Sequence, residues 1–461
     1  MNKHYPLVII GAGPAGLAAA TLATEQGLEC AVLDEQPTPG GQIYRNIEHI
    51  PEKTAQQLGP DYSYGRHLTD AFRQSGAAYF PETRVWSLNA AREIGLTHNN
   101  QSRIITADNI LIATGAMERP VPFPGWTLPG IMQAGAAQIL LKTAQIIPDQ
   151  PVVIAGSGPL LLLLAWQYSR LGVNIAAILD TTPSGNVINA LPLLPKALPA
   201  YAYLQKGLVL QQALKQAGVP TIKTVQHIQA TGHDHIEAVS YQKNGKTYLI
   251  ETDLLLTHFG VIPHIWLTQA ASCQHRWNDS QQCWQPVTDN WGHSSLDGIF
   301  IAGDSSGIYG AKSAEYAGRL SALACLFKVG KISHHQRDRL AKQDLKRLRT
   351  DRAIRPFLER YFRIPKSWLN PADDTMVCRC EEISAGQIRH AIAQGHDDSN
   401  QVKYITRCGM GPCQGRQCSL SVAHIVAAET GCRIADAGIF RGRPPVMPLT
   451  LQQLSGLDYE E

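Results

Sequence analysis

Tyr5-Pro-Leu-Val-Ile-Ile10-Gly11-Ala-Gly13-Pro-Ala-Gly16 is the stretch of sequence that decides the fold of this 461-residue chain. Its apolar first half predicts a buried strand of a parallel sheet, and the residues after Gly16 predict a helix that ends near Gln26. Cys30–Leu33 then predicts a second strand. A strand, a helix and a strand in this order form the unit from which parallel sheets covered by helices are built. We therefore expect an α/β fold.

The glycine spacing in this stretch predicts a dinucleotide site. Gly11 permits a tight turn, Gly13 lets the backbone approach a pyrophosphate, and Gly16 lets the helix pack closely on the strand. The N-terminus of the helix offers free N–H groups and a partial positive charge to phosphates. Asp34 lies 23 residues after Gly11, where a carboxylate can accept hydrogen bonds from an adenosine ribose, and Glu35 is the neighbouring alternative.

A second unit of the same kind begins 145 residues later, at Gly156-Ser-Gly158-Pro-Leu-Leu161, between the predicted strands Val152–Ala155 and Ile175–Leu179. Leu161 stands where the third glycine should be. Asp180 and the following Thr-Thr-Pro-Ser-Gly segment supply no arginine for a 2′-phosphate, so NADPH is not expected. Two interpretations stay open. The unit binds a second nucleotide or FMN, or it keeps the fold and holds something else or nothing.

Two further segments, Ala113-Thr114-Gly115 and Gly303-Asp304, follow apolar strands, and Gly40-Gly41-Gln42 follows Asp34. With the glycine loop, they resemble the two-dinucleotide-binding-domain flavoproteins of the glutathione and thioredoxin reductase type. The resemblance implies FAD at the first loop and the following contact residues: Gly11, Ala12, Gly13, Gly16, Asp34, Glu35, Gly41, Gln42, Thr114, Gly115, Gly303 and Asp304.

Disulfide reductases of that superfamily carry a redox-active Cys-x-x-Cys or Cys-x4-Cys pair beside the flavin. No such pair is formed by the four cysteines outside the C-terminal region: Cys30, Cys273, Cys283 and Cys325. We therefore do not expect a disulfide reductase. No general base can be assigned either, because His258, His264 and Glu315 are candidates by residue type only.

Five of the ten cysteines lie between residues 378 and 418, which predicts a metal centre. Cys-x-Cys spacing is unusual for zinc, and the glycine-rich loop at 409–415 offers backbone N–H groups to cluster sulfides. The pattern resembles the bacterioferritin-associated-ferredoxin-like [2Fe–2S] domain. That resemblance implies four ligands, Cys378, Cys380, Cys413 and Cys418, and Cys408 as a non-ligand. Zinc bound by the same four cysteines is the lesser alternative.

Composition and order complete the predicted organisation. A net charge of +3 does not indicate nucleic-acid binding, and the apolar runs are broken by glycines or too short to cross a bilayer. The start lacks a signal-peptide pattern, so we expect a cytoplasmic protein that is not integral to a membrane, with peripheral attachment through a partner as an alternative. The predicted units are an FAD-binding domain (1–118 and 290–330), an inserted nucleotide-binding-like domain (119–289), a basic helical connector (331–373), a helical [2Fe–2S] domain (374–432) and a proline-containing tail (433–461).

This order of units, with Leu33-Asp-Glu-Gln-Pro-Thr-Pro-Gly-Gly-Gln-Ile-Tyr44-Arg45, resembles the α-type subunits of heteromeric amino-acid dehydrogenases, the group that includes the opine oxidase and hydrogen cyanide synthase subunits of this type. The resemblance implies a partner FAD subunit of the D-amino-acid-oxidase type that oxidises a C–N bond, a small ferredoxin-like protein as a further partner, and electron relay through this chain. The alternatives are a free-standing NADH-dependent flavin/[2Fe–2S] reductase and a non-catalytic iron–sulfur carrier. The substrate and the final electron acceptor are not readable from the sequence.

Overall fold

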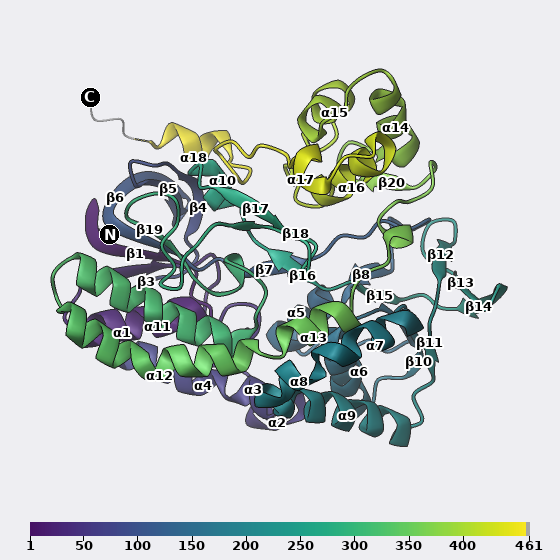
Figure 1. The fold of residues 1–461 in the computed structure, drawn as a ribbon, viewed down its shortest axis with the longest axis horizontal. Helices are drawn as coiled ribbons and strands as arrows, with labels where there is room; N and C mark the ends of the chain where they lie inside the picture. Colours follow the sequence, from purple (N-terminus) through teal and green to yellow (C-terminus); the bar gives the residue numbers. More distant parts are fainter. Residues whose placement is uncertain (458–461) are drawn as a thin grey trace.

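The first of the two main sheets holds the N-terminal strand near its centre, and its strands are parallel except for β4 and β5. The computed structural model describes residues 1–457, and its first sheet has the order β3-β2-β1-β6, with β19 on the other side of β6 (Figure 1). These strands are β1 (His4–Ile10), β2 (Cys30–Leu33), β3 (Ala78–Phe80), β6 (Gln101–Ile112) and β19 (Ile299–Ile301). The register pairs Ile10 with Ile112 and Ile112 with Ile301, so the strand ends meet at one edge.

Strand β6 is long enough to pair with different strands along its two halves. Its second half pairs with β1 and β19, and its first half pairs antiparallel with β5 (Glu93–His98), which pairs in turn with β4 (Arg84–Leu88). This meander and α10 (Trp266–Ala270) cover one face of the sheet, where they share a buried core with Val8 and Ile10.

Helices α1 (Pro14–Glu25) and α11 (Ala311–Lys328) cover the opposite face and pack side by side (Figure 1). A Cβ atom on Gly318 would lie 2.0 Å from the backbone oxygen of Ala15, so this approach requires glycine. Helix α12 (His334–Arg352) packs outside α11 through an ion pair between Arg319 and Asp344 at 2.8 Å. The basic connector is therefore packed against the body of the protein.

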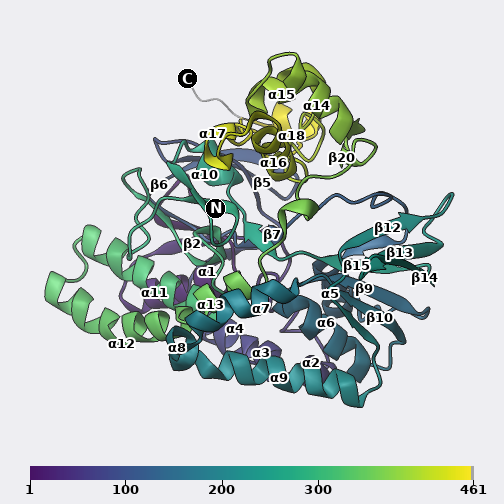
Figure 2. The ribbon, with the colours of Figure 1, turned by 45° about the vertical axis from the view of Figure 1, so that its right-hand side comes forward.

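The second sheet is also parallel, with the order β11-β10-β9-β15-β8. Its strands are β8 (Ile131–Gln133), β9 (Val152–Gly156), β10 (Ile175–Asp180), β11 (Thr221–Lys223) and β15 (Leu255–His258). The meander β12 (His227–Thr231), β13 (Ala238–Lys243) and β14 (Lys246–Glu251) projects from this unit (Figure 2). Its helices are α5 (Ala134–Ala144), α6 (Pro159–Arg170), α7 (Ser184–Ala190), α8 (Leu194–Ala197) and α9 (Tyr201–Gln216).

Two short antiparallel strands carry the chain into and out of the second unit. They are β7 (Ala116–Glu118) and β16 (Val261–Pro263). The following elements, α10, β17 (His275–Asn278) and β18 (Cys283–Pro286), come before β19, and Trp266 of α10 packs in the core of the first sheet. The predicted unit boundaries stay predictions, and this packing favours a return to the first unit at β16 rather than at residue 290.

A small helical module sits above the first unit (Figures 1 and 2). It contains β20 (Met376–Cys378), β21 (Ile383–Ser384), α14 (Ala385–Ala393), α15 (Ser399–Thr406), α16 (Ser419–Thr430) and α17 (Ile434–Ala437). Phe440 from the tail is fully buried in its core, and Val446 packs on the first sheet. The remaining helices are α2 (Glu52–Leu58), α3 (Pro60–Ser63), α4 (Gly65–Gln74), α13 (Arg355–Tyr361) and α18 (Leu451–Ser455).

The predicted fold class, two dinucleotide-binding-type α/β units with a small helical module, is confirmed. Among residues 1–457, no helix combines the length and the apolar character needed to cross a bilayer.

Candidate functional site

The first glycine loop is built so that only glycine fits at two of its positions. Gly11 has φ +107°, and a Cβ there would lie 2.5 Å from the backbone oxygen of Ala113. A Cβ on Gly16 would lie 1.9 Å from the backbone oxygen of Gly11. Helix α1 starts after Gly13, and no side chain caps it. Its first N–H groups are therefore open to an anionic ligand.

Asp34 closes this loop from the end of β2. Its carboxylate accepts hydrogen bonds from the backbone N–H of Ala12 at 2.5 Å and of Gln36 at 2.8 Å. Burial raises the pKa of the Asp34 carboxyl. The neighbouring candidate Glu35 is exposed. The structure therefore brings Asp34 to the loop and leaves Glu35 on the surface.

The segment of Gly41 and Gln42 lies directly on the loop, since a Cβ on Gly41 would lie 2.8 Å from the Cα of Gly13. A lysine from the second unit holds this segment in place. Lys142 on α5 donates hydrogen bonds to the backbone oxygens of Gln42 at 3.2 Å and Ile43 at 2.9 Å. This buried contact joins the two units beside the predicted FAD site, and no sequence pattern indicated it.

Lys142 gives this contact a defined pH dependence. Burial lowers the pKa of the Lys142 ammonium to about 7, and the charge of Arg45 adds to the shift. The unfolded chain keeps that proton to a pH of about 10.4. Between these values the unfolded state binds more protons, so the folded state gains stability as pH rises. We expect the melting temperature of the native protein to rise relative to that of Lys142→Met between pH 7 and about 9.5. A difference that is constant with pH would contradict this.

The remaining predicted FAD residues follow strands of the same sheet edge. Thr114 and Gly115 come just after β6, and the Thr114 hydroxyl donates to the backbone oxygen of His264 at 3.1 Å. Gly303 and Asp304 come just after β19. The Asp304 carboxylate accepts the backbone N–H of Tyr309 at 2.8 Å and the N–H of Gly310 at 2.9 Å, which orders the turn before α11.

These features fit a dinucleotide with an attached ring system. The carboxyl ends of β1, β6 and β19 meet at one edge, where ligands of open α/β sheets bind. Helices α1 and α11 both begin there without a capping side chain, so two N-termini can face negative charge. The role of each residue in binding FAD stays a prediction.

The second glycine loop has a different backbone. Gly158 has φ +118° where Gly13 has φ −81°, and the buried Leu161 takes the position of Gly16. The Asp180 carboxylate accepts the N–H of Thr182 at 2.9 Å and, unlike Asp34, makes no bond to its glycine loop. The backbone of this turn therefore differs from that of the first loop, and the ligand of this unit stays open.

A buried histidine–glutamate pair stands beside this second loop. His258 ends β15, and its Nδ1 lies 2.6 Å from the Oε1 of Glu118 on β7. The other Glu118 oxygen accepts the N–H of Gly135 at 2.8 Å. A Cβ on Gly158 would lie 3.4 Å from the His258 ring. A polar residue at the end of an apolar parallel strand was the one sequence signal for this site.

The C-terminal cysteines form a three-membered and a two-membered group. The Sγ atoms of Cys378, Cys408 and Cys418 all lie within 4.8 Å of one another, and all three residues are buried. Hydrogen bonds from the thiols of Cys408 and Cys418 lower the pKa of Cys378 to about 2. Cys380 is exposed and hydrogen-bonds with the Cys413 thiol.

This donor set fits a thiolate-bound metal centre. The predicted ligand set of Cys378, Cys380, Cys413 and Cys418 stays a prediction. The structure adds Cys408 to the group, which the sequence pattern had set apart. Cys30, Cys273, Cys283 and Cys325 are buried and unpaired, and burial raises the pKa of all four thiols, so they are not reactive thiols.

The cysteine loop at 409–418 contacts the tail, which in turn packs on the first sheet through Val446. The Arg416 side chain donates to the backbone oxygens of Cys413 at 3.1 Å and Val446 at 3.3 Å. Burial, with the nearby charge of Arg416, lowers the pKa of His264 to about 4. The charge of Arg416 thus acts on the histidine whose carbonyl accepts the Thr114 hydroxyl.

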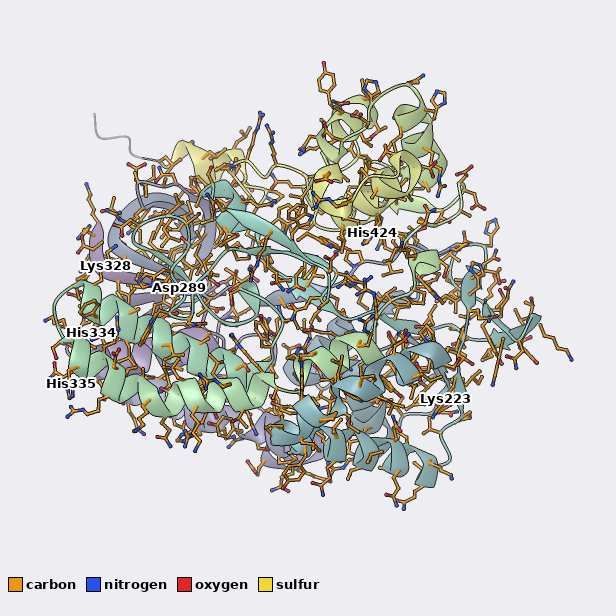
Figure 3. The ribbon with its side chains drawn as sticks, in the orientation of Figure 1. Lys223, Asp289, Lys328, His334, His335 and His424 are labelled. Carbon is orange, nitrogen blue, oxygen red and sulfur yellow. The ribbon has the colours of Figure 1, made fainter. Side chains whose placement is uncertain are left out.

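A second contact lies at α16. His424 sits at the base of the module, on the side toward the body of the protein (Figure 3), with its ring centre 5.9 Å from that of Trp277 on β17. Burial lowers the pKa of His424 to about 3, so this ring stays neutral in the contact.

Glu315, one of the candidate general bases considered from the sequence, accepts the Tyr64 hydroxyl at 3.1 Å, and burial raises the pKa of its carboxyl.

Comparison with known families gives two matches. Residues 5–319 match the pyridine nucleotide-disulphide oxidoreductase family, and residues 372–456 match the sarcosine oxidase A3 domain. The second match covers the cysteine module together with most of the tail. The ferredoxin-like resemblance of this module stays a prediction.

The chain is 43% identical to the A-type opine oxidase subunit of Rhizobium meliloti, over 100% of this chain and 89% of that protein. It is 31% identical to the hydrogen cyanide synthase subunit HcnB of Pseudomonas aeruginosa, over 98% of this chain and 99% of that protein. The alpha subunit of sarcosine oxidase from Rhizobium meliloti is 23% identical over 98% of this chain, which spans 42% of that longer protein.

Among solved structures, L-proline dehydrogenase from P. horikoshii matches with a TM-score of 0.71 at 19% identity, over 98% of this chain and 79% of that one. Thioredoxin reductase from T. acidophilum matches with a TM-score of 0.52 at 19% identity, over 71% of this chain and 99% of that one. These two show the fold alone. From the family matches and the curated relatives, the chain belongs to the FAD-dependent pyridine nucleotide-disulphide oxidoreductase family, in the group of the A-type opine oxidase subunits and the hydrogen cyanide synthase subunit HcnB.

Proposed function

We propose that this chain is the electron-transferring subunit of a heteromeric dehydrogenase that oxidises a C–N bond of an opine or another amino acid. The names of its relatives support a multi-subunit enzyme, since they are called subunits of opine oxidase, hydrogen cyanide synthase and sarcosine oxidase. We place the amine site in a partner of the D-amino-acid-oxidase type. A small ferredoxin-like protein is a second proposed partner.

One arrangement carries this proposal. The carbonyl of His264 accepts the Thr114 hydroxyl at the predicted FAD edge, and burial together with the charge of Arg416, from the cysteine loop, lowers the pKa of the His264 ring. Arg416 in turn holds the backbone oxygen of Cys413. The nearness of the two proposed redox sites that this charge effect indicates supports electron relay between them.

FAD accepts two electrons together and can return them singly to a [2Fe–2S] centre, which carries one at a time. This chain's residues provide the two binding sites and their spacing. The glycine loop and Asp34 hold the dinucleotide end, and the cysteine module holds the metal. We propose a cytoplasmic location, where reducing conditions preserve thiolate ligands.

The partner would dock on exposed apolar residues of the segment from α7 to α9, in the lower right part of the molecule in Figure 1. Single exposed apolar residues are common, but here several of them fall within residues 187–209. The exposed group comprises Val187, Ile188, Leu191, Leu198, Tyr201, Leu208 and Val209. Relatives named as subunits supply the reason to expect a partner there.

Charges on this surface should weaken the complex. Ile188 is 70% exposed and Leu208 is 67% exposed, so aspartate at both positions leaves the folded monomer undisturbed. We expect co-purification of the partner with Ile188→Asp/Leu208→Asp to fall at least about tenfold, because buried charges at an interface are costly. Leu249→Asp, at a site 62% exposed on β14, is the matched control and should retain the partner. Equal recovery with both variants would place the interface elsewhere.

The function itself is tested by producing the chain together with the protein of its neighbouring reading frame, followed by a screen of opines and amino acids. We expect a substrate to bleach the flavin of the complex and not of the isolated chain. Bleaching of the isolated chain by NADH alone would instead indicate the free-standing reductase. A purified chain that is colourless and binds only zinc would refute both.

A further inference from the structure

We propose that Arg45 binds the diphosphate of FAD and supplies a full positive charge that the glycine loop itself lacks. The inference rests on the proposed function, since it takes FAD to lie at the first loop, and it adds a residue to that site. Arg45 ends the stretch 33–45 that supports the family resemblance, but the sequence alone gives it no role.

The guanidinium of Arg45 is buried and has no partner in the described chain. Arg45 is 6% exposed, and its Nε is sealed from solvent without a hydrogen bond. Among residues 1–457, its side chain takes part in no hydrogen bond and no ion pair. A buried charge of this kind is costly, because it has lost its water and gained no acceptor. Such a group points to an anionic ligand as its partner.

A second buried arginine shows what a structural guanidinium does in this protein. Arg119 is 5% exposed, and its side chain donates to the backbone oxygens of Gln282 at 2.7 Å and Gln281 at 2.6 Å. These bonds replace the water that Arg119 loses on burial. Arg45 is buried to the same degree and has no such bonds, so support of the fold does not account for it.

Backbone contacts fix Arg45 beside the first glycine loop. The N–H of Gly40 donates to the backbone oxygen of Ala12 at 2.8 Å, and the N–H of Tyr44 donates to the oxygen of Gly40 at 3.1 Å. The Tyr62 hydroxyl then donates to the backbone oxygen of Arg45 at 2.6 Å. Arg45 is therefore held one turn of the chain away from the residues that touch the loop.

The other charged groups of this site are already bonded. The Asp34 carboxylate accepts two backbone N–H groups and forms no ion pair with Arg45. Lys142 donates to two backbone oxygens and, at 3.0 Å, to the Oε1 of Gln138, which uses every hydrogen of its ammonium group. Burial lowers the pKa of the Arg45 guanidinium, and the charge of Asp34 opposes that shift. Arg45 alone among these charges has all its donors free.

A diphosphate is the ligand group that this charge fits. In folds of this kind the pyrophosphate lies at the N-terminus of the helix that follows the first glycine loop. The N-terminus of α1 offers only a partial positive charge, which a diphosphate exceeds. A planar guanidinium can donate to two phosphate oxygens at once, and it does so more strongly than a neutral donor. Arg45 would thus complete the charge of the phosphate site.

The test compares Arg45→Met and Arg45→Lys with Arg66→Met in the full-length chain. Arg66 on α4 is the matched control, because its guanidinium donates to the backbone oxygen of Ile50 at 3.1 Å and pairs with Glu52 at 3.3 Å. Calorimetry on each chain freed of flavin gives dissociation constants for FAD, ADP and adenosine. ADP carries the diphosphate and adenosine does not, so the two probes separate phosphate binding from the shape of the site.

We expect the dissociation constants for FAD and ADP to rise at least about tenfold in Arg45→Met, because charged hydrogen bonds to phosphate are lost. Binding of adenosine should stay unchanged. Arg45→Lys should lie between, since lysine keeps the charge and loses the planar fork. Flavin-free Arg45→Met should melt no lower than the native chain, because an unpaired buried charge has been removed. Arg66→Met should bind FAD as the native chain does.

Unchanged binding of FAD and ADP by Arg45→Met overturns the proposal. An equal loss of ADP and adenosine binding also overturns it, because Arg45 would then support the shape of the site and not the phosphates. If Arg45→Met does not fold, Arg45→Lys decides: weaker ADP binding with unchanged adenosine binding supports the proposal, and unchanged ADP binding overturns it. A native chain that binds no FAD instead refutes the proposed function.

Discussion

Replacement of Cys418 by alanine should strip the protein of iron and leave its flavin in place. Cys418 is fully buried at the start of α16, and alanine there removes one of four proposed ligands. Even the loss of groups that only support metal ligands lowers metal affinity by about 10–100-fold. We therefore expect iron per chain to fall at least about tenfold, with the EPR signal of the reduced protein lost.

The flavin should survive because the cysteine module and the glycine loop belong to separate cores. Cys30→Ala is the matched control for a buried thiol, since Cys30 lies in the first core and far from the metal loop in sequence. It should keep both iron and flavin. Full iron content in Cys418→Ala would show that Cys418 is not needed as a ligand, and the proposed ligand set would be wrong.

Sequence predicted those parts of the protein whose geometry is local. The strand Cys30–Leu33 has the predicted bounds, and the helix after the first glycine loop ends at Glu25, one residue before Gln26. Both follow from the pattern of apolar residues and from a turn that accommodates only glycine at Gly11 and Gly16. By contrast, the positive φ of Gly158 in the second loop was not predicted from the sequence.

The features that sequence missed depend on packing between distant segments. Cys408 joins Cys378 and Cys418 because β20, the end of α15 and the start of α16 meet around Phe440, which comes from the tail. The His258–Glu118 pair joins residues 140 positions apart. Spacing along the chain carries no signal for such contacts. The element order could therefore be predicted, whereas the full group of clustered thiols could not.

A methyl group on Gly16 should abolish FAD binding. A Cβ there would lie 1.9 Å from the backbone oxygen of Gly11 and 3.1 Å from its carbonyl carbon, and both belong to the turn that forms the proposed phosphate site. Backbone atoms cannot move aside as a flexible side chain can, so α1 has to shift away from β1. We expect flavin per chain in Gly16→Ala to fall at least about tenfold, because phosphate binding depends on the N–H groups of that helix end.

The control is Gly207→Ala on α9, where a Cβ meets no atom within 4 Å. This change should keep the flavin and slightly raise the melting temperature, because alanine is favoured over glycine inside a helix by about 0.5–1 kcal/mol. Iron content separates a local effect from general unfolding, since Gly16→Ala should still hold iron in the C-terminal module. Gly16→Ala protein that retains its flavin would refute the proposed position of FAD, because no dinucleotide could then depend on the close approach of α1 to β1.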